Sequence, residues 1–213
     1  MSDMRIRARA GEPVLEALRA ATAQAHRRLE QMTGLTSPTL DRATYAQALA
    51  CLLRVVGPLE AAVSEAVPPR LQAFTAARRK AALLREDLAC LAADPGRGGS
   101  IGRAADRLPD PVRLPRLGGT AAAFGALYVL EGSMLGGMVI APHVERCLGV
   151  SPGTCTRYFR AYGEGAGRMW RAWRDALARE VAAEDREEAI TAAVGAFEAF
   201  GAAFASPGAS SPG

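Results

Sequence analysis

The residue with the clearest chemical capacity is His26, which lies in the segment ATAQAHRRLE with Glu30 four residues after it. If the segment is helical, the two side chains are neighbours on one face, at the edge of an apolar stripe. A neutral imidazole in that position can bind a metal ion. A partly buried helix histidine paired with Glu30 would show the same pattern. His26 alone therefore leaves both interpretations open.

Arg19 precedes His26 by seven residues, which is two turns along the same face of a helix. The two side chains would then lie about 10 Å apart along the helix axis. A metal ligand at His26 and a guanidinium for an acidic group of the same bound molecule could share this face. The alternative for Arg19 is an ordinary surface charge.

A second candidate is the segment GALYVLEGSMLGG, which places glycines at positions 125, 132, 136 and 137 of an otherwise apolar helical run. Each glycine inside a helix costs about 0.5–1 kcal/mol relative to alanine. Gly132 and Gly136 are one turn apart, so they leave a strip of helix surface without side chains. Either another helix or a flat ligand can approach such a strip closely. The spacing of the glycines favours neither helix packing nor ligand binding.

The remaining motifs indicate no second site. His143 follows Pro142 in APHVERCLG, and we expect it to be exposed beside Glu145 and Arg146. The GRGGSIG run does not match a phosphate-binding loop, and no predicted strand precedes it. The chain contains no Glu-x-x-His motif, so the main signature of a di-iron carboxylate bundle is missing.

The composition predicts a cytoplasmic protein with neither nucleic acid nor membrane as a partner. The net charge of +4, from 26 basic and 22 acidic residues, is too small to favour nucleic acid, although it would suit a ligand with carboxylates. We find no secretory signal and no uncharged apolar stretch long enough to span a membrane. The four cysteines form no CxxC pair, so we expect reduced thiols.

The elements that must position these residues are helices. Alanine, leucine and arginine are abundant, and no alternating strand pattern of useful length occurs. We therefore predict an all-α, single-domain helix bundle over residues 12–205, between a flexible N-terminus (1–11) and a disordered tail (206–213). The expected helices cover 12–32, a stretch within 37–67 with a kink or a break at Gly57-Pro58, 71–92, a short piece at 101–107, 120–148, a helix from Ser151 onward, and 185–204.

Two of these segments together resemble the haem oxygenase family. LRAATAQAHRRLE (18–30) is similar to the family's proximal helix, and LYVLEGSMLGG (127–137) is similar to its glycine-rich distal helix. A later segment, YFRAYGEGAGRMWRAW (158–173), resembles a further part of the family. The resemblance covers residues 15–204 and is closest to bacterial members, including those that accompany bacteriophytochromes.

The resemblance implies an enzyme that cleaves haem to biliverdin, CO and iron. Haem would be both cofactor and substrate, with O2 and an external electron donor (a ferredoxin, a flavoprotein or another reductase) as co-reactants. A bacteriophytochrome is a further candidate partner. His26 would hold the iron, and Gly132, Ser133 and Gly136 would form the catalytic face. The implied haem contacts are Arg19, Glu30, Tyr128, Gly137, Arg168 and Arg171.

Ser133 stands where mammalian-type members of the family have an aspartate that orders water beside the oxygen. The sequence does not show what replaces that carboxylate.

Two other functions fit the same residues. One is a haem carrier or sensor that binds without turnover, and the other is a protein of the same fold with a different ligand.

Overall fold

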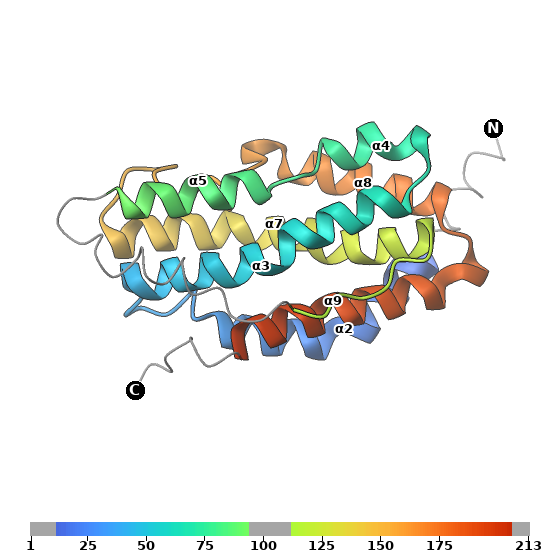
Figure 1. Ribbon diagram of the computed structural model, residues 1–213, viewed down its shortest axis with the longest axis horizontal. Helices are drawn as coiled ribbons and strands as arrows, with labels where there is room; N and C mark the ends of the chain where they lie inside the picture. Colours follow the sequence, from blue (N-terminus) through green and yellow to red (C-terminus); the bar gives the residue numbers. More distant parts are fainter. Residues whose placement is uncertain (1–11, 94–111, 206–213) are drawn as a thin grey trace.

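The helix α7 (Thr120–Leu148) runs through the middle of the molecule, and the other helices pack around it (Figure 1). It lies along α9 and also contacts α3 and α8, while α2 packs mainly on α9. The computed structural model describes residues 12–93 and 112–205, and these ranges contain no strand. The all-α prediction is confirmed. The other helices are α2 (Glu12–Thr33), α3 (Arg42–Ala66), α4 (Pro69–Ala76), α5 (Ala81–Ala92), α8 (Ala166–Glu180) and α9 (Arg186–Ala205).

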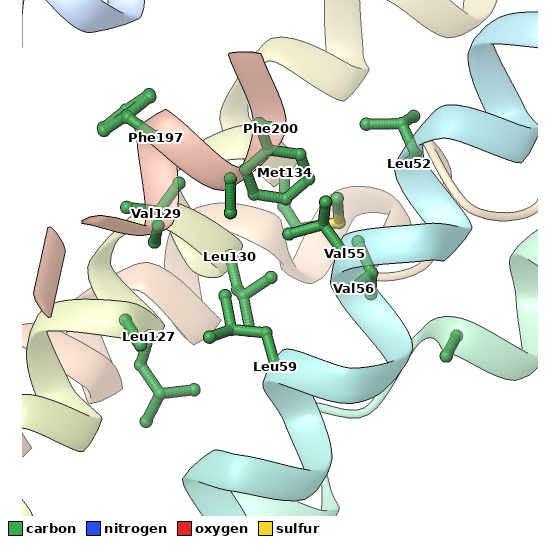
Figure 2. Close-up of a cluster of buried hydrophobic side chains, with 14 of the residues drawn as sticks. Leu52, Val55, Val56, Leu59, Leu127, Val129, Leu130, Met134, Phe197 and Phe200 are labelled. Atoms are coloured by element: carbon green, nitrogen blue, oxygen red, sulfur yellow. The ribbon is translucent and has the colours of Figure 1, made fainter. Parts of the chain in front are cut away.

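The core lies where α3, α7 and α9 meet (Figure 2). Aliphatic side chains of α3 and α7, such as Leu59 and Leu130, pack there with Phe200 of α9. Burying one such side chain contributes about 1.5–3 kcal/mol. The buried face of α9 is rich in alanine, which lets α7 approach closely. At Gly125 the approach is so close that a Cβ atom would overlap the carbonyl group of Ala189.

Of the kink or break expected at Gly57-Pro58, the break does not occur: α3 continues through Pro58 to Ala66. The single helix expected over residues 71–92 is instead two helices, α4 and α5. Residues 77–80 separate them, where Arg78 and Lys80 turn inward and are almost fully buried. The segments 1–11, 101–107 and 206–213, for which we predicted a flexible start, a short helix and a disordered tail, lie outside the described residues.

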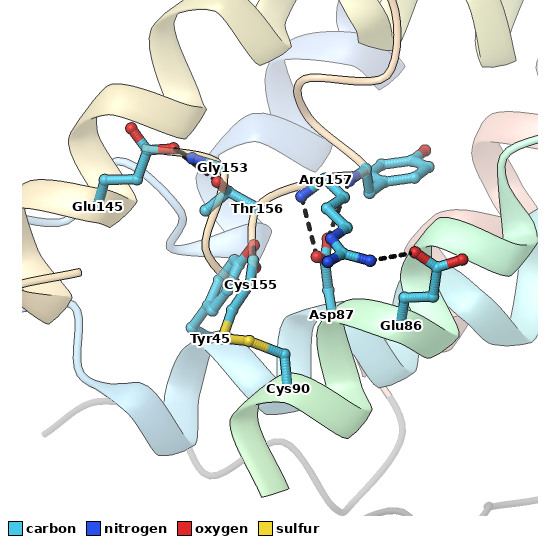
Figure 3. The surroundings of a disulfide bond; sticks show 10 residues. Tyr45, Glu86, Asp87, Cys90, Glu145, Gly153, Cys155, Thr156 and Arg157 are labelled. Atoms are coloured by element: carbon cyan, nitrogen blue, oxygen red, sulfur yellow. Dashed lines mark hydrogen bonds and ion pairs between the residues drawn. A yellow bond between two sulfur atoms is a disulfide. The ribbon is translucent and has the colours of Figure 1, made fainter. Parts of the chain in front are cut away.

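The helix expected from Ser151 is also absent, since residues 151–162 form a series of turns and α8 begins only at Ala166. Figure 3 shows what holds these turns in place. Asp87 of α5 accepts hydrogen bonds from the backbone N–H groups of Arg157 and Tyr158, both at 2.9 Å. Tyr45 of α3 donates to the carbonyl of Cys155 at 2.9 Å. We refer to residues 151–162 as the turn segment.

Cys90 and Cys155 form a disulfide that links the end of α5 to the turn segment (Figure 3). The expectation of reduced thiols was therefore wrong for these two residues. The sequence could not indicate the pairing, because 65 residues separate the partners. Cys51 and Cys147 are free cysteines.

Three helices are long and apolar enough to cross a membrane when only length and composition are considered: α3, α7 and the stretch 183–205 that includes α9. In the folded chain, 61%, 56% and 50% of their most apolar windows are buried. Half or more of each window therefore lies inside the bundle.

Candidate functional site

A pocket of about 450 Å³ lies between α2, α7 and α9. Its volume falls in the range of small-molecule sites, and its lining is mainly apolar with a few polar groups, as is usual for such sites. α2 and α7 both pack on α9, and the pocket opens between them. The lining comprises Arg19, His26, Leu29, Glu30 and Thr33 of α2, Leu35, Leu52 of α3, Tyr128, Val129, Gly132, Ser133, Leu135, Gly136 and Ile140 of α7, Tyr158, Phe159, Trp170 of α8, and Phe197 and Phe200 of α9.

His26 lines this pocket, and its side chain is 52% exposed. Its Nδ1 lies 3.5 Å from a carboxylate oxygen of Glu30, and the edge of its ring meets Phe197 with centroids 5.8 Å apart. Glu30 is itself 66% exposed, so this contact adds little stability. It does engage Nδ1, which leaves Nε2 as the nitrogen that can bind a metal.

Arg19, Tyr128 and Trp170 line the same pocket from three different helices. Arg19 is exposed and lies two turns before His26 on α2, as the sequence predicts. The Tyr128 hydroxyl lies 3.5 Å from the hydroxyl of Thr22, and its ring centroid is 6.2 Å from that of Trp170. A guanidinium and a phenol in one pocket can hold an acidic group of a ligand.

The four glycines of α7 divide into two pairs with different surroundings. A Cβ atom at Gly132 would meet no atom within 4 Å, and one at Gly136 would only touch Ile140 of the same helix. Both residues face the pocket. Cβ atoms at Gly125 and Gly137 would instead overlap the backbone of Ala189 and Phe159. Gly132 and Gly136, which we call the glycine strip, therefore leave space for a ligand, while the other pair allows close packing.

Ser133 and Tyr158 supply hydroxyl groups to the wall of the pocket beside the glycine strip. The Ser133 hydroxyl donates to the carbonyl of Leu130 at 2.8 Å. Burial raises the pKa of the Tyr158 phenol well above its ordinary value, and a hydrogen bond with Ser133 opposes that rise. Tyr158 was not among the residues expected in the site, since nothing in its local sequence shows that the turn segment returns to α7.

Three residues expected in the site lie elsewhere. Gly137 packs against Phe159 on another side of α7. Arg168 and Arg171 are exposed on α8 and are not among the pocket residues. The reason is the helix start: with α8 beginning at Ala166, the apolar face presents Trp170 and Trp173 to the bundle, and the two arginines face outward.

His143 is half-buried, which corrects the prediction that it is exposed. Its Nε2 lies 2.8 Å from the carbonyl oxygen of Ser37 and 3.5 Å from the sulfur of Cys147. Glu145, expected beside it on the surface, is buried as well. His143 does not line the pocket, so His26 is the pocket's histidine.

Within the described residues, no group of three or more His, Cys, Asp or Glu side chains could together hold a metal ion. A metal ion in this pocket would therefore need further ligands from the bound molecule. An iron held in a planar ring would bring such ligands with it, and His26 could bind it from the protein.

The comparisons with known proteins identify the family and the fold. The sequence model of the family described as heme oxygenase matches residues 12–206. The fold is similar to that of the haem oxygenase from Neisseria meningitidis solved with NO and CO bound, with a TM-score of 0.67, 22% identity and coverage of 90% of this chain and 89% of that one. It is also similar to haem oxygenase 2 from Chlamydomonas reinhardtii, solved without haem, with a TM-score of 0.67, 17% identity and coverage of 91% and 96%. No curated protein matches the chain.

Proposed function

This chain belongs to the haem oxygenase family, and from that premise we propose that the pocket between α2 and α7 binds haem, with His26 as the iron ligand. The observation that carries the proposal is that His26 and the glycine strip, which lie far apart in the sequence, line one pocket from two helices. One helix offers a metal ligand, and the other offers a surface without side chains that a flat ring can approach.

The activity of the family is the oxidative cleavage of haem to biliverdin, CO and iron, and this chain is accordingly a haem-degrading enzyme. Bound haem supplies both the iron that activates O2 and the ring that is cleaved. The work of the protein is to orient the ring, to exclude bulk water and to deliver protons.

The α2 side of the pocket orients the ring. Nδ1 of His26 lies 3.5 Å from a carboxylate oxygen of Glu30, and this contact can orient the ring so that Nε2 is the nitrogen available to the iron. Arg19 and Tyr128 line the same pocket and can hold the two carboxylates of the haem edge by charge and by hydrogen bonding. Holding that edge selects which part of the ring faces the oxygen.

The α7 side supports the oxygen chemistry mainly by what it lacks. The glycine strip places no side chain that could bind the iron or fill the oxygen position. The hydroxyls of Ser133 and Tyr158 are polar groups beside the strip that can hold water and a proton there. Phe159, Phe197 and Phe200 line the same pocket and give it apolar walls that a bound ring would complete.

The test is a comparison of His26→Ala with His143→Ala. Titration of ferric haem into the wild-type protein should give a Soret band, and reductant with O2 should then yield the spectrum of biliverdin. We expect His26→Ala to lose the ligated spectrum and the turnover. His143→Ala should retain both, because His143 lies outside the pocket.

Three outcomes would contradict the assignment in different ways. Haem that stays intact in air and reductant would indicate a carrier or sensor. A ligated spectrum that survives in His26→Ala would remove the proposed iron ligand. Loss of the ligated spectrum in His143→Ala but not in His26→Ala would identify His143 of α7 as the iron ligand.

We also propose a redox partner and a location. The reaction consumes electrons from outside the chain, so a ferredoxin, a flavoprotein or another reductase is the expected donor, and a bacteriophytochrome is a candidate acceptor of the product. A cytoplasmic location is supported by the use of the long apolar helices inside the bundle. The Cys90–Cys155 disulfide is more usual in oxidising compartments, so fractionation of cells is the appropriate measurement.

A further inference from the structure

Glu131, the residue directly before Gly132 on α7, is the centre of a buried group of charged side chains. The Glu131 side chain is 1% exposed, and its carboxylate lies 2.7 Å from the ammonium of Lys80. The Lys80 side chain is itself only 2% exposed. The Tyr162 hydroxyl donates to the same carboxylate oxygen at 2.8 Å and accepts from Lys80 at 2.9 Å. We call Glu131, Lys80, Tyr162 and Arg78 the Glu131 cluster.

Arg78 completes the cluster on the other side of the carboxylate. Its Nε lies 3.5 Å from the second oxygen of Glu131. Neither of these two atoms has a hydrogen-bond partner among the described residues. The Lys80 ammonium also donates to the carbonyl of Arg78 at 2.8 Å, and Glu60 accepts from the backbone N–H of Lys80 at 2.6 Å. Two cations and two carboxylates are thus gathered in the interior.

Such a group is a poor device for stability alone. Removing charged groups from water carries a large desolvation penalty, and well-packed apolar side chains of similar volume are often as stable or more so. Burial accordingly lowers the pKa of Lys80, against the opposing effect of Glu131. Ion pairs with fixed hydrogen-bond geometry can instead hold the elements that carry them in one defined position, as buried polar groups do in some protein cores.

The cluster joins three separate parts of the chain, and two of them build the pocket. Arg78 and Lys80 belong to the link between α4 and α5, Glu131 belongs to α7, and Tyr162 ends the turn segment, which also carries Tyr158 and Phe159. The glycine strip has no packing partner of its own on the pocket side. The orientation of α7 at this point must therefore be determined by its other faces.

We propose that Glu131 and Lys80 are positioning residues that fix the rotation of α7 at the glycine strip and hold the turn segment in register with it. Successive residues on a helix point about 100° apart, so a tether on Glu131 sets the direction in which Gly132 faces. Tyr162 extends the same tether to the wall that carries Tyr158. This inference rests on the proposed function, since it concerns how the chain presents its oxygen-side wall to the haem.

The test uses Glu131→Gln, which keeps the shape and removes the charge, and the double variant Glu131→Gln/Lys80→Met, which removes both charges. In both variants we expect ligation by His26 to persist, with a haem Kd within about threefold of the wild type. The C–O stretching frequency of the CO-bound ferrous haem should shift, and the ratio of biliverdin isomers should change. The double variant should regain the thermal stability lost in the single one, without regaining the wild-type CO frequency.

Glu145→Gln is the matched control. Glu145 is also a buried carboxylate of α7 with an arginine partner, Arg160, but it lies 14 residues beyond Glu131. It should lower the stability of the fold but shift the CO frequency and the isomer ratio much less than the Glu131 variants do, because its contacts with the turn segment (Gly153, Thr156 and Arg160) lie at the far end of α7 from the glycine strip.

The inference is overturned if the two variants keep the wild-type CO frequency and isomer ratio, or if Glu145→Gln shifts them equally. If the single variant does not fold, the double variant, which leaves no unpaired ammonium at Lys80, carries the same test. These outcomes are separate from the fate of the proposed function, which depends on the His26→Ala spectrum.

Discussion

The glycines of α7 illustrate how residues of one type do different work in this protein. Gly125 lets α7 approach α9, and Gly137 lets it approach the turn segment. Gly132 and Gly136 have no other helix packed against them and instead face the pocket. The residues around each glycine come from distant parts of the chain. The spacing of the glycines along α7 therefore cannot show which of them pack against backbone and which face the pocket.

Alanine substitutions should therefore have opposite effects on stability at two of these positions. Gly132→Ala adds a methyl group where the backbone has room, so the helix should gain about 0.5–1 kcal/mol of stability. The same methyl group stands in the pocket, and haem should bind about tenfold more weakly or be cleaved more slowly. Thermal denaturation and haem titration of one preparation measure both effects.

Gly125→Ala is the comparison for that experiment. Its Cβ would overlap the backbone of Ala189, so α7 and α9 must separate, and we expect a loss of about 1–3 kcal/mol in the free energy of unfolding. If Gly132→Ala destabilised the protein as much as Gly125→Ala, the strip would be a packing surface and not a ligand surface.

At the scale of elements, the wrong boundaries have a common cause. The helix expected over 71–92 is interrupted at Lys80 because its ammonium reaches Glu131 in the interior. The helix expected from Ser151 is replaced by turns because Asp87 accepts two backbone N–H groups of the turn segment. In both places a contact between elements overrides the local helix propensity. Such a contact is visible only in the folded chain.

Glu145 joins the C-terminal end of α7 to the turn segment, and it predicts a response to acid. Its carboxylate accepts two hydrogen bonds from Arg160 at 2.6 Å, one from Thr156 at 2.6 Å and one from the N–H of Gly153 at 2.8 Å. These bonds, those from Arg160 above all, lower the pKa of Glu145 from its ordinary 4.5 to about 2. The charged form is therefore favoured in the folded state.

A lowered folded-state pKa gives stability that is present above pH 4.5 and is lost as the pH falls from there to about 2. The amount is on the order of 3 kcal/mol. We expect Glu145→Gln to be less stable than the wild type at pH 7 and to converge on it near pH 2. Urea denaturation across this pH range measures the difference, and a constant gap at all pH values would contradict the assignment.

For the molecule as a whole, the sequence predicts the helical architecture well. The bounds of α2, α7 and α9 are within two residues of expectation, because their apolar periodicity is long and regular. The structure also brings His26 and Glu30 of α2 together with Gly132 and Ser133 of α7 in the lining of one pocket, while their roles stay a prediction. Trp170, Phe197 and Tyr158 were missed, since an aromatic residue on an apolar face looks the same whether it fills a core or lines a cavity.

The Cys90–Cys155 disulfide, which was also missed, yields a prediction for the whole fold. It closes a loop of 65 residues that contains α7, and constraining such a loop in the unfolded chain stabilises the folded state by about 2–4 kcal/mol. We expect dithiothreitol to lower the free energy of unfolding of the wild type by this amount. The variant Cys90→Ser/Cys155→Ser should not respond to dithiothreitol, while Cys147→Ser should respond as the wild type does.

The turn segment gives this disulfide a second effect, because Cys155 lies three residues before Tyr158 and four before Phe159 in the pocket wall. Asp87 and Tyr45 hold the same turns by hydrogen bonds that reduction does not break. We therefore expect reduced protein to bind haem with its stability lowered but its pocket intact. Thiol titration of the unfolded, unreduced chain should find two free cysteines of the four, and four free thiols would show that the bond does not form.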